Sequence, residues 1–191
     1  DRFTEAFEEK LEAHLRKHAR PLVERFIQSL PGKRVLDAGC GPGLYAAIFK
    51  ERGLSPVCVD LSRKMLARCQ GRSLDCVLGD LLRMPVASGS VHGVWAYASL
   101  LHVPRAGGSV AVEEFARVLV PGGMLELAVK DGVGEGFQED ERYPGIKRWF
   151  TLFQDDEIRA LFASRFTQIG DLITTAGATS VFLHYLFRKR D

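Results

Sequence analysis

The feature that most constrains the fold is the segment Val35–Gly43, which reads Val-Leu-Asp-Ala-Gly-Cys-Gly-Pro-Gly. An apolar run ends at Asp37, glycines follow at 39, 41 and 43, and a helix-compatible run begins at Leu44. Glycine has no Cβ and tolerates positive φ, so the backbone of such a turn can approach a ligand closely. The helix that follows presents unpaired N–H groups and a partial positive charge. We therefore predict a strand, a glycine turn and a helix that together cradle a cofactor.

Strand and helix patterns alternate after this segment. We predict helices over 44–52, 63–70 and 107–119 and strands over 33–38, 56–60, 74–79, 91–98 and 124–129. Such alternation produces parallel βαβ units. Two later β-rich runs, 166–174 and 179–187, have a short connection, which favours an antiparallel hairpin at the sheet edge. The expected fold class is α/β: a doubly wound, mostly parallel seven-stranded sheet with a C-terminal antiparallel hairpin.

The chain length suits a single domain over residues 1–191. We predict three parts: N-terminal helices over 1–31, a cofactor-binding core over 33–130, and a substrate-side loop, helix and edge hairpin over 131–191. Apolar residues recur every four positions from Phe3 to Leu15, which indicates a packed helix or, alternatively, a lid over the ligand. Glycines and charges over 130–147 predict an extended surface loop, and Gln154 or Asp155 is expected to cap the next helix.

Composition limits the classes of partner. The net charge of +2 is too small to demand a nucleic-acid or membrane partner. No apolar run reaches the roughly 18–20 residues of a membrane span, and none resembles a signal peptide. The four cysteines form no C-x-x-C pair and no cluster with ligand spacing along the chain, so we expect structural thiols and no metal. Together these observations favour a cytoplasmic protein.

The glycine spacing and nearby carboxylates indicate which cofactor is bound. A dinucleotide site would show G-x-G-x-x-G, whereas the spacing here is G-x-G-x-G, and no Gly-Lys-Ser/Thr of a phosphate loop follows. A carboxylate at Asp37 would repel a pyrophosphate but suits an ammonium group. Asp60 and Asp80 end the next two predicted strands, where they can accept from ribose hydroxyls and an exocyclic amine. This pattern fits S-adenosylmethionine, although each aspartate has the alternative of capping a helix or forming a turn.

At these residues the chain resembles the class I S-adenosylmethionine-dependent methyltransferases. The segment Val35–Gly43, Asp60, Gly79-Asp80 and the runs 95–103 and 117–123 match landmarks of that family in order, over about residues 33–130. The resemblance implies the Rossmann-like fold of the family, S-adenosylmethionine as cofactor and S-adenosylhomocysteine as product. It also implies these contacts: Gly39 and Gly41 beside the methionine portion, Asp37 near its amino group, Asp60 on the ribose, Leu61 against adenine, Asp80 and Leu81 at the adenine amine, and Tyr97 at the methyl-bearing end.

The substrate side is less marked. His102 follows the fourth predicted strand and is a candidate proton acceptor or substrate contact, with a structural histidine as the alternative. Arg148 and Phe150 follow the long loop and are candidates for lining the acceptor pocket, with core packing as the alternative.

We expect methyl transfer to a small-molecule acceptor by in-line displacement, in which the protein mainly aligns donor and acceptor. One alternative is an enzyme that modifies RNA such as tRNA, or protein, through the basic segments 16–20 or 188–190. Another is a partner subunit that binds S-adenosylmethionine without catalysis.

Overall fold

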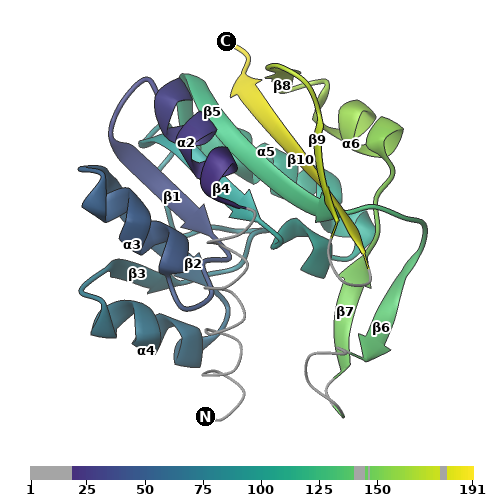
Figure 1. Ribbon diagram of the computed structural model, residues 1–191, viewed down its shortest axis with the longest axis horizontal. Helices are drawn as coiled ribbons and strands as arrows, with labels where there is room; N and C mark the ends of the chain where they lie inside the picture. The colour runs from purple at the N-terminus through teal and green to yellow at the C-terminus, as the bar shows by residue number, and fades with distance from the viewer. Residues whose placement is uncertain (1–18, 140–144, 146, 177–179) are drawn as a thin grey trace.

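The computed structural model describes residues 19–139, 145, 147–176 and 180–191. The chain folds around one β-sheet with helices on both faces (Figure 1). The helices are α2 (Arg20–Ser29), α3 (Leu44–Glu51), α4 (Arg63–Gly71), α5 (Gly108–Val118) and α6 (Asp155–Phe162), with short 3-10 turns η2 (Leu100–His102) and η3 (Arg105–Gly107). The strands are β1 (Arg34–Ala38), β2 (Ser55–Asp60), β3 (Asp75–Leu78), β4 (Val91–Tyr97), β5 (Leu119–Lys130), β6 (Glu135–Glu139), β7 (Lys147–Thr151), β8 (Phe166–Gln168), β9 (Ile173–Ala176) and β10 (Val181–Lys189). The expected N-terminal lid falls on residues 1–18, which lie outside the described residues.

The main sheet has the strand order β3-β2-β1-β4-β5-β10-β8, and β9 pairs with β10. The first five strands run parallel, whereas β10 runs antiparallel to β5, with Phe182 opposite Lys130 and Arg188 opposite Met124. Strands β8 and β9 pair with opposite ends of β10, so both lie beside β10 at the same edge of the sheet. The eight strands therefore stand in seven places across the sheet. The structure confirms the predicted doubly wound, mostly parallel sheet with antiparallel C-terminal strands.

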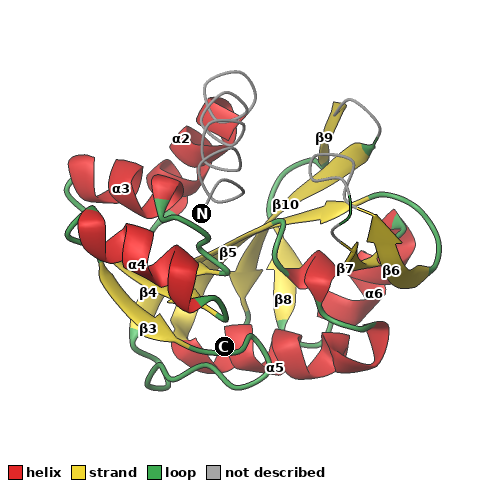
Figure 2. Cartoon of the chain, turned by 90° about the horizontal axis from the view of Figure 1, so that it is seen from below, coloured by secondary structure: helices red, strands yellow, loops and turns green. Residues whose placement is uncertain are grey.

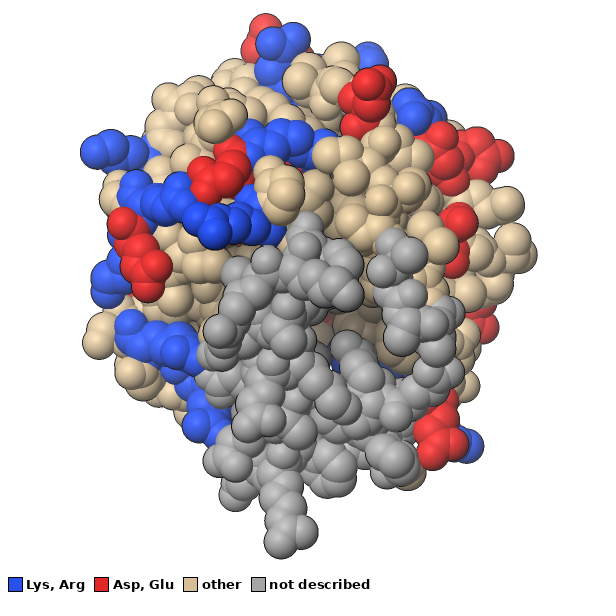
Figure 3. All heavy atoms as spheres, viewed as in Figure 1, with Lys and Arg blue, Asp and Glu red and all other residues tan. Residues whose placement is uncertain are grey.

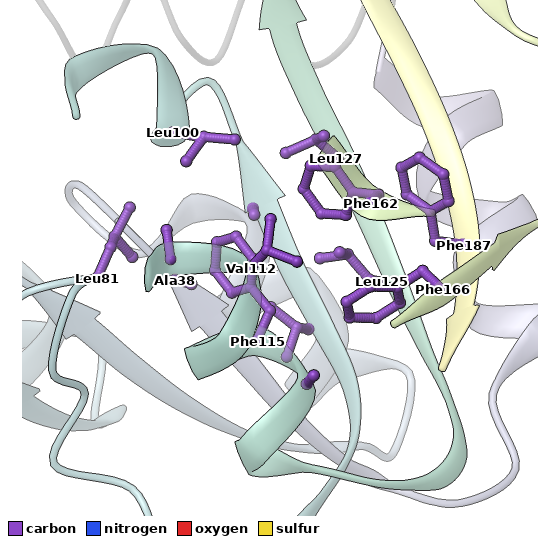
Figure 4. Close-up of a cluster of buried hydrophobic side chains, with 14 of the residues drawn as sticks. Ala38, Leu81, Leu100, Val112, Phe115, Leu125, Leu127, Phe162, Phe166 and Phe187 are labelled. Carbon is purple, nitrogen blue, oxygen red and sulfur yellow. The ribbon is translucent and has the colours of Figure 1, made fainter. Parts of the chain in front are cut away.

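Each face of the sheet is covered by an apolar layer. On one face α5 and α6 contribute Phe115 and Phe162 to the core, and the Phe162 ring stacks on that of Phe187 of β10 with centroids 4.9 Å apart (Figure 4). On the other face α2 and α3 pack around Trp95, whose ring centroid lies 5.3 Å from that of Phe26. Figure 2 shows α2, α3 and α4 on the side opposite α5 and α6. Full burial of each large side chain contributes about 1.5–3 kcal/mol, so the two layers hold the strand ends in place.

Ends of two helices are held by specific polar contacts. Ser62 accepts from the Met65 backbone N–H and caps α4, as its position before the apolar run suggests. At α6 the carboxylate of Glu157 accepts from the Gln154 backbone N–H at 2.9 Å, so Gln154 is the cap residue. Helix α2 is fastened to β5 by Arg25, whose guanidinium meets the buried Glu126 carboxylate at 2.7 and 2.8 Å.

None of the described helices is long and apolar enough to cross a membrane.

The prediction of an extended surface loop over 130–147 is wrong for residues 135–139, which form strand β6. Strands β6 and β7 form a separate antiparallel two-stranded sheet, from the pair Glu135 and Thr151 to the pair Glu139 and Lys147. Buried Thr151 donates its hydroxyl to the Val103 carbonyl at 2.8 Å, which ties this hairpin to the segment after η2. Glycines and charges hid the short strands because both are uncommon inside strands. The hairpin lies beyond the carboxyl ends of the parallel strands (Figure 1).

Candidate cofactor and acceptor site

The site lies at the topological switch point of the sheet, between β1 and β4. The chain passes from β1 outward to β2 and β3, then returns to place β4 on the other side of β1. In open α/β sheets, ligands bind in the crevice outside the carboxyl ends of the strands at such a point. Asp37 near the end of β1, Asp60 at the end of β2, Asp80 just after β3 and Tyr97 at the end of β4 all come to this edge. The structure therefore brings the predicted carboxylates to one side of the sheet.

The glycine turn between β1 and α3 has the predicted strand–turn–helix form. Gly39, Gly41 and Gly43 have φ values of +79°, +54° and +80°, in the left-handed region. The backbone N–H groups of Gly39 and Cys40 both donate to the Val59 carbonyl, at 2.8 and 3.1 Å, so the turn is pinned to β2. A Cβ added at Gly39 would lie 2.4 Å from Cβ of Ser99, the residue that follows β4 by two positions. Only glycine fits this turn without displacing its neighbours.

Asp60 is oriented by the backbone around it. Its Oδ2 accepts from the Gly41 N–H and its Oδ1 from the Ser62 N–H, each at 2.8 Å. Burial raises the pKa of the Asp60 carboxyl, and the two backbone N–H groups act in the opposite direction. Each carboxylate oxygen has a further lone pair, so the group can accept from hydroxyls while it holds the glycine turn.

Two buried polar atoms beside the turn have no hydrogen-bond partner among the described residues. They are Oδ2 of Asp37, a side chain only 2% exposed, and Oγ of Ser99. Burial raises the pKa of Asp37 well above its usual range, although the Ala46 backbone N–H lowers it in part. A buried group without a partner costs about 1–3 kcal/mol. An ammonium group beside the Asp37 carboxylate would supply the donor that Oδ2 lacks, so this corner of the edge suits the amino group of S-adenosylmethionine. Ser99 was not among the predicted site residues.

The remaining predicted cofactor residues have distinct surroundings. Leu61 is 70% exposed directly after Asp60, where a flat ring could lie on it. The side chain of Leu81 is buried in the core near Ala38 (Figure 4), which leaves its backbone for a ligand. Oδ1 of Asp80 accepts from the Leu82 N–H at 2.9 Å, the turn-forming role that was its alternative. Its contact with adenine therefore stays a prediction.

Tyr97 lies within an aromatic stack at the end of β4. Its ring is nearly parallel to that of Trp95, with centroids 5.5 Å apart, and lies 5.0 Å from the ring of Tyr45. Burial raises the pKa of the Tyr97 phenol, so the hydroxyl keeps its proton at neutral pH. The placement of Tyr97 at the methyl-bearing end stays a prediction.

The predicted acceptor residues come together between η2 and the β6–β7 hairpin. Nδ1 of His102 lies 2.7 Å from the Trp149 carbonyl oxygen, which can only accept, so Nδ1 carries the proton. Nε2 then has the lone pair and lies 2.5 Å from Nη2 of Arg148. The His102 ring also packs on Phe150, with centroids 4.9 Å apart. Both ring nitrogens of His102 therefore have partners, one of them the structural backbone contact weighed for this residue.

Two cationic side chains, those of Lys130 and Arg148, lie close to the buried ring of Phe150 near the cofactor edge of the sheet. Nζ of Lys130, the last residue of β5, is 4.3 Å from the centroid of Phe150, and Cζ of Arg148 is 5.7 Å from it. Phe150 is only 3% exposed, in agreement with the packing alternative, but its position also orders the two cations. The positive charge of Arg148 lowers the pKa of Asp60 in part, so Arg148 lies within electrostatic reach of the cofactor edge. Lys130 was not predicted, and its position at a strand end was the available signal.

Three cysteines meet beneath the glycine turn. Cys40, Cys58 and Cys69 are buried, and their Sγ atoms all lie within 4.8 Å of one another. The Sγ atoms of Cys40 and Cys69 are 3.7 Å apart, and Sγ of Cys69 is 3.4 Å from the Gly41 carbonyl oxygen. Spacing along the chain could not reveal this cluster, because strand pairing and the β2–α4 crossover bring the three thiols together.

Comparison with known proteins agrees with this geometry. Residues 36–127, from within β1 to within β5, match the methyltransferase domain family. Together with the fold and the arrangement of the strand-end residues, this match supports assigning residues 36–127 to a methyltransferase domain of the class I S-adenosylmethionine-dependent type.

Particular relatives differ in what their names say they methylate. The tRNA (carboxymethyluridine(34)-5-O)-methyltransferase of Mus musculus is 36% identical over 111 residues, which are 57% of this chain and 16% of that protein. Methyltransferase GfsG of Streptomyces halstedii is 34% identical over 140 residues, 69% of this chain and 49% of that protein. The malonyl-[acyl-carrier protein] O-methyltransferase of Enterobacter lignolyticus is 33% identical over 120 residues, 59% of this chain and 47% of that protein. The chain thus spans half or less of the length of these relatives.

Among solved structures, the 1,6-didemethyltoxoflavin-N1-methyltransferase of Burkholderia thailandensis was crystallised with its substrate and S-adenosylhomocysteine. It superposes with a TM-score of 0.76 at 22% identity, covering 99% of this chain and 86% of that one. At this identity the likeness supports the fold.

Proposed function

We propose that this chain catalyses methyl transfer from S-adenosylmethionine to an acceptor by in-line displacement. The observation that carries the proposal is the pair of buried oxygens without described partners, Asp37 Oδ2 and Ser99 Oγ, beside a glycine turn that leaves no room for a Cβ. S-adenosylmethionine supplies an activated methyl group on its sulfonium. The residues of the chain therefore need mainly to align donor and acceptor, which contributes up to roughly 7–11 kcal/mol.

The roles follow the positions of the residues along the edge. Asp37 and Ser99 would receive the ammonium group, and Gly39 and Gly41 would let the backbone pass beside the methionine portion. The oriented Asp60 would accept from the ribose hydroxyls. The adenine contacts would come from exposed Leu61 on one face and from Asp80 and the Leu81 backbone at the amine, and Tyr97 would border the methyl group. A pyrophosphate is disfavoured in this corner, because its charge would oppose a buried carboxylate.

We propose a small molecule as the acceptor. The C-terminal basic segment does not favour RNA, because Arg188 pairs opposite Met124, at the end of the sheet far from Lys130 and the cofactor edge. A groove of about 430 Å³ is present at that far end, lined by Gly122, Thr167 and residues 188–191. The other basic segment, 16–20, lies largely outside the described residues. Figure 3 shows one face on which lysine and arginine gather toward α3 and α4 and acidic side chains gather on the opposite side.

An RNA acceptor is the second candidate, because a named relative modifies tRNA. Its affinity would fall steeply with salt, which a small-molecule acceptor would not show. A non-catalytic partner subunit is the third candidate and would show cofactor binding without turnover. We also propose that the chain acts in the cytoplasm, where its four unpaired cysteines would stay reduced.

Calorimetry with three ligands tests the cofactor assignment. We expect S-adenosylmethionine and S-adenosylhomocysteine to bind and NAD not to bind. The Asp60→Ala variant should lose at least about tenfold in affinity, equal to about 1.4 kcal/mol, because ribose hydroxyls would lose a charged acceptor. Asp156→Ala is a matched control, since Asp156 is an aspartate in the first turn of α6, away from this edge. Binding of NAD, or equal affinities for both variants, would contradict the proposal.

A further inference from the structure

All four cysteines of the chain lie in one cluster beneath the glycine turn. Cys40 belongs to the turn, Cys58 to β2 and Cys69 to α4, and none of these three side chains is more than 4% exposed. Cys76 of β3 stands opposite Cys58 in the sheet and packs against the same cluster, but it is only half-buried. Three separate elements therefore bring a thiol to one point in the interior.

The buried thiols share their space with a backbone oxygen. The Sγ atoms of Cys40, Cys58 and Cys69 lie within 4.8 Å of one another, and those of Cys40 and Cys69 are 3.7 Å apart. The Gly41 carbonyl oxygen is 3.5 Å from Sγ of Cys40 and 3.4 Å from Sγ of Cys69. A thiol is a weak hydrogen-bond donor, and apolar packing alone does not require sulfur at three neighbouring positions. The cluster therefore offers three soft metal ligands and one oxygen at a single point.

The distances in the cluster match the edges of a tetrahedron around a metal ion. Zinc binds thiolate sulfur at about 2.3 Å and oxygen at about 2.0–2.2 Å in tetrahedral sites. Tetrahedral angles then place two sulfurs about 3.8 Å apart, and a sulfur and an oxygen about 3.5–3.7 Å apart. The edges formed by Cys40, Cys69 and Gly41, at 3.7, 3.5 and 3.4 Å, agree with these values. Sγ of Cys58 lies within 4.8 Å of both other sulfurs, so a small inward shift would complete the tetrahedron.

We propose that Cys40, Cys58 and Cys69 bind one zinc-type divalent cation as thiolates, with the Gly41 carbonyl oxygen as the fourth ligand. Each thiol releases its proton to solvent as the ion binds, and no electron is transferred. Thiolates select such an ion over magnesium or calcium, and the oxygen ligand distinguishes the site from one for copper(I). Because four protein atoms close the coordination sphere, the site is structural. The ion cross-links the glycine turn, β2 and α4.

Metal titration of the intact chain tests this proposal. The protein is reduced with a phosphine, freed of metal with a chelator, and titrated with Zn²⁺ in competition with a chromophoric chelator. A second titration uses Co²⁺ as a spectroscopic probe. We expect one equivalent of Zn²⁺ to bind, and we expect Co²⁺ to give sulfur-to-cobalt charge-transfer bands and the ligand-field bands of four-coordinate cobalt, which Zn²⁺ then abolishes. Failure to bind Zn²⁺, binding of copper(I) in place of Zn²⁺, or cobalt binding without charge-transfer bands would overturn the proposal.

Serine variants identify the ligands. Cys58→Ser and Cys69→Ser should each weaken Zn²⁺ binding at least about tenfold and remove about one third of the charge-transfer intensity, because one of three thiolates is lost. Cys76→Ser is the matched control, since Cys76 belongs to the same cluster but its Sγ faces the Leu66 carbonyl oxygen, at 3.6 Å. It should bind Zn²⁺ and Co²⁺ as the wild-type protein does. An equal loss in Cys76→Ser, or no loss in Cys58→Ser and Cys69→Ser, would refute the ligand set.

Thermal unfolding of the wild-type protein gives a second readout that needs no variant. An ion that binds the folded chain and not the unfolded chain raises the unfolding temperature in proportion to its occupancy. With free Zn²⁺ at 100 times its Kd, the protein should unfold about 5–11 °C higher than in its metal-free form. Equal unfolding temperatures in spite of one bound equivalent of Zn²⁺ would overturn the structural role.

Discussion

Substitution of Gly39 by alanine tests the geometry on which the cofactor site depends. Gly39 has φ +79°, and a Cβ there would lie 2.4 Å from Cβ of Ser99. The left-handed backbone costs an L-residue about 1–2 kcal/mol, and forcing an extra methyl into packed surroundings costs about 1–3 kcal/mol. We therefore expect a loss of roughly 2–5 kcal/mol in the free energy of unfolding.

Gly53 provides the matched control because it has φ +76° and no atom within 4 Å of an added Cβ. Gly53→Ala should show only the backbone cost. At about 2–4 °C per kcal/mol for a chain of this size, Gly39→Ala should unfold roughly 2–12 °C below Gly53→Ala.

The assays are urea unfolding and calorimetric titration with S-adenosylmethionine. Gly39→Ala should lose cofactor affinity because Ser99 and the turn must move apart, whereas Gly53→Ala should bind normally. The double variant Gly39→Ala/Ser99→Gly removes the clashing Cβ and should recover much of the stability difference, as a coupled pair does. Equal stability and equal affinity for the two single alanine variants would refute the reasoning.

Three further predictions concern other contacts. Ser99→Ala should weaken binding of S-adenosylmethionine by about 5–20-fold in calorimetry without lowering stability, because the buried hydroxyl that it removes has no hydrogen-bond partner among the described residues. Unchanged affinity would remove Ser99 from the site. Arg25→Met should cost up to about 3–5 kcal/mol at a pH above the folded pKa of about 8, where Glu126 is ionised, because it leaves a buried charge unpaired. Burial raises the pKa of Glu126 to about 8, above its unfolded value, so stability that depends on its protonation is present at low pH and lost as pH rises through the folded pKa. Urea unfolding should therefore show a larger penalty for Arg25→Met at pH 8 than at about pH 5.5, and the opposite order would contradict the assignment. Thr151→Val should lower the free energy of unfolding by about 1–3 kcal/mol, because the Val103 carbonyl loses its hydrogen-bond donor. It should also raise the acceptor KM, because the β6–β7 hairpin is then held less firmly. An unchanged KM with lower stability would show that the hairpin takes no part in acceptor binding.

Much of the fold was predictable because local patterns and tertiary packing agree in it. The strand, glycine turn and helix at 35–51 carry their own conformational requirements, since three positive φ values demand glycine at 39, 41 and 43. The placement of Asp37 and Asp60 at one edge was predictable because the carboxyl ends of successive parallel strands meet there. The same logic of strand ends could have identified Lys130.

Other features depend on contacts that no local pattern encodes. Ser99 matters because β4 lies beside β1 and brings it against Gly39, and the thiol cluster exists because Cys58 of β2 meets residues of the turn and of α4. The state of His102 is set by Trp149 and Arg148, more than 40 residues away in the chain. The β6–β7 hairpin was missed because pairing between its strands overrode a composition typical of loops.

The β6–β7 hairpin forms its ladder of hydrogen bonds only within itself, as far as the described residues show, and the main sheet keeps its register without it. If the proposed site is right, donor and acceptor recognition belong to separate parts of the fold: the strand ends of the main sheet would bind the donor, and the β6–β7 hairpin would contact the acceptor. On that proposal, a change confined to residues 135–151 would alter which molecule is modified and leave the donor pocket as it is. Related proteins with this scaffold would then change their acceptor through substitutions in the hairpin, and the fold of the main sheet would stay the same.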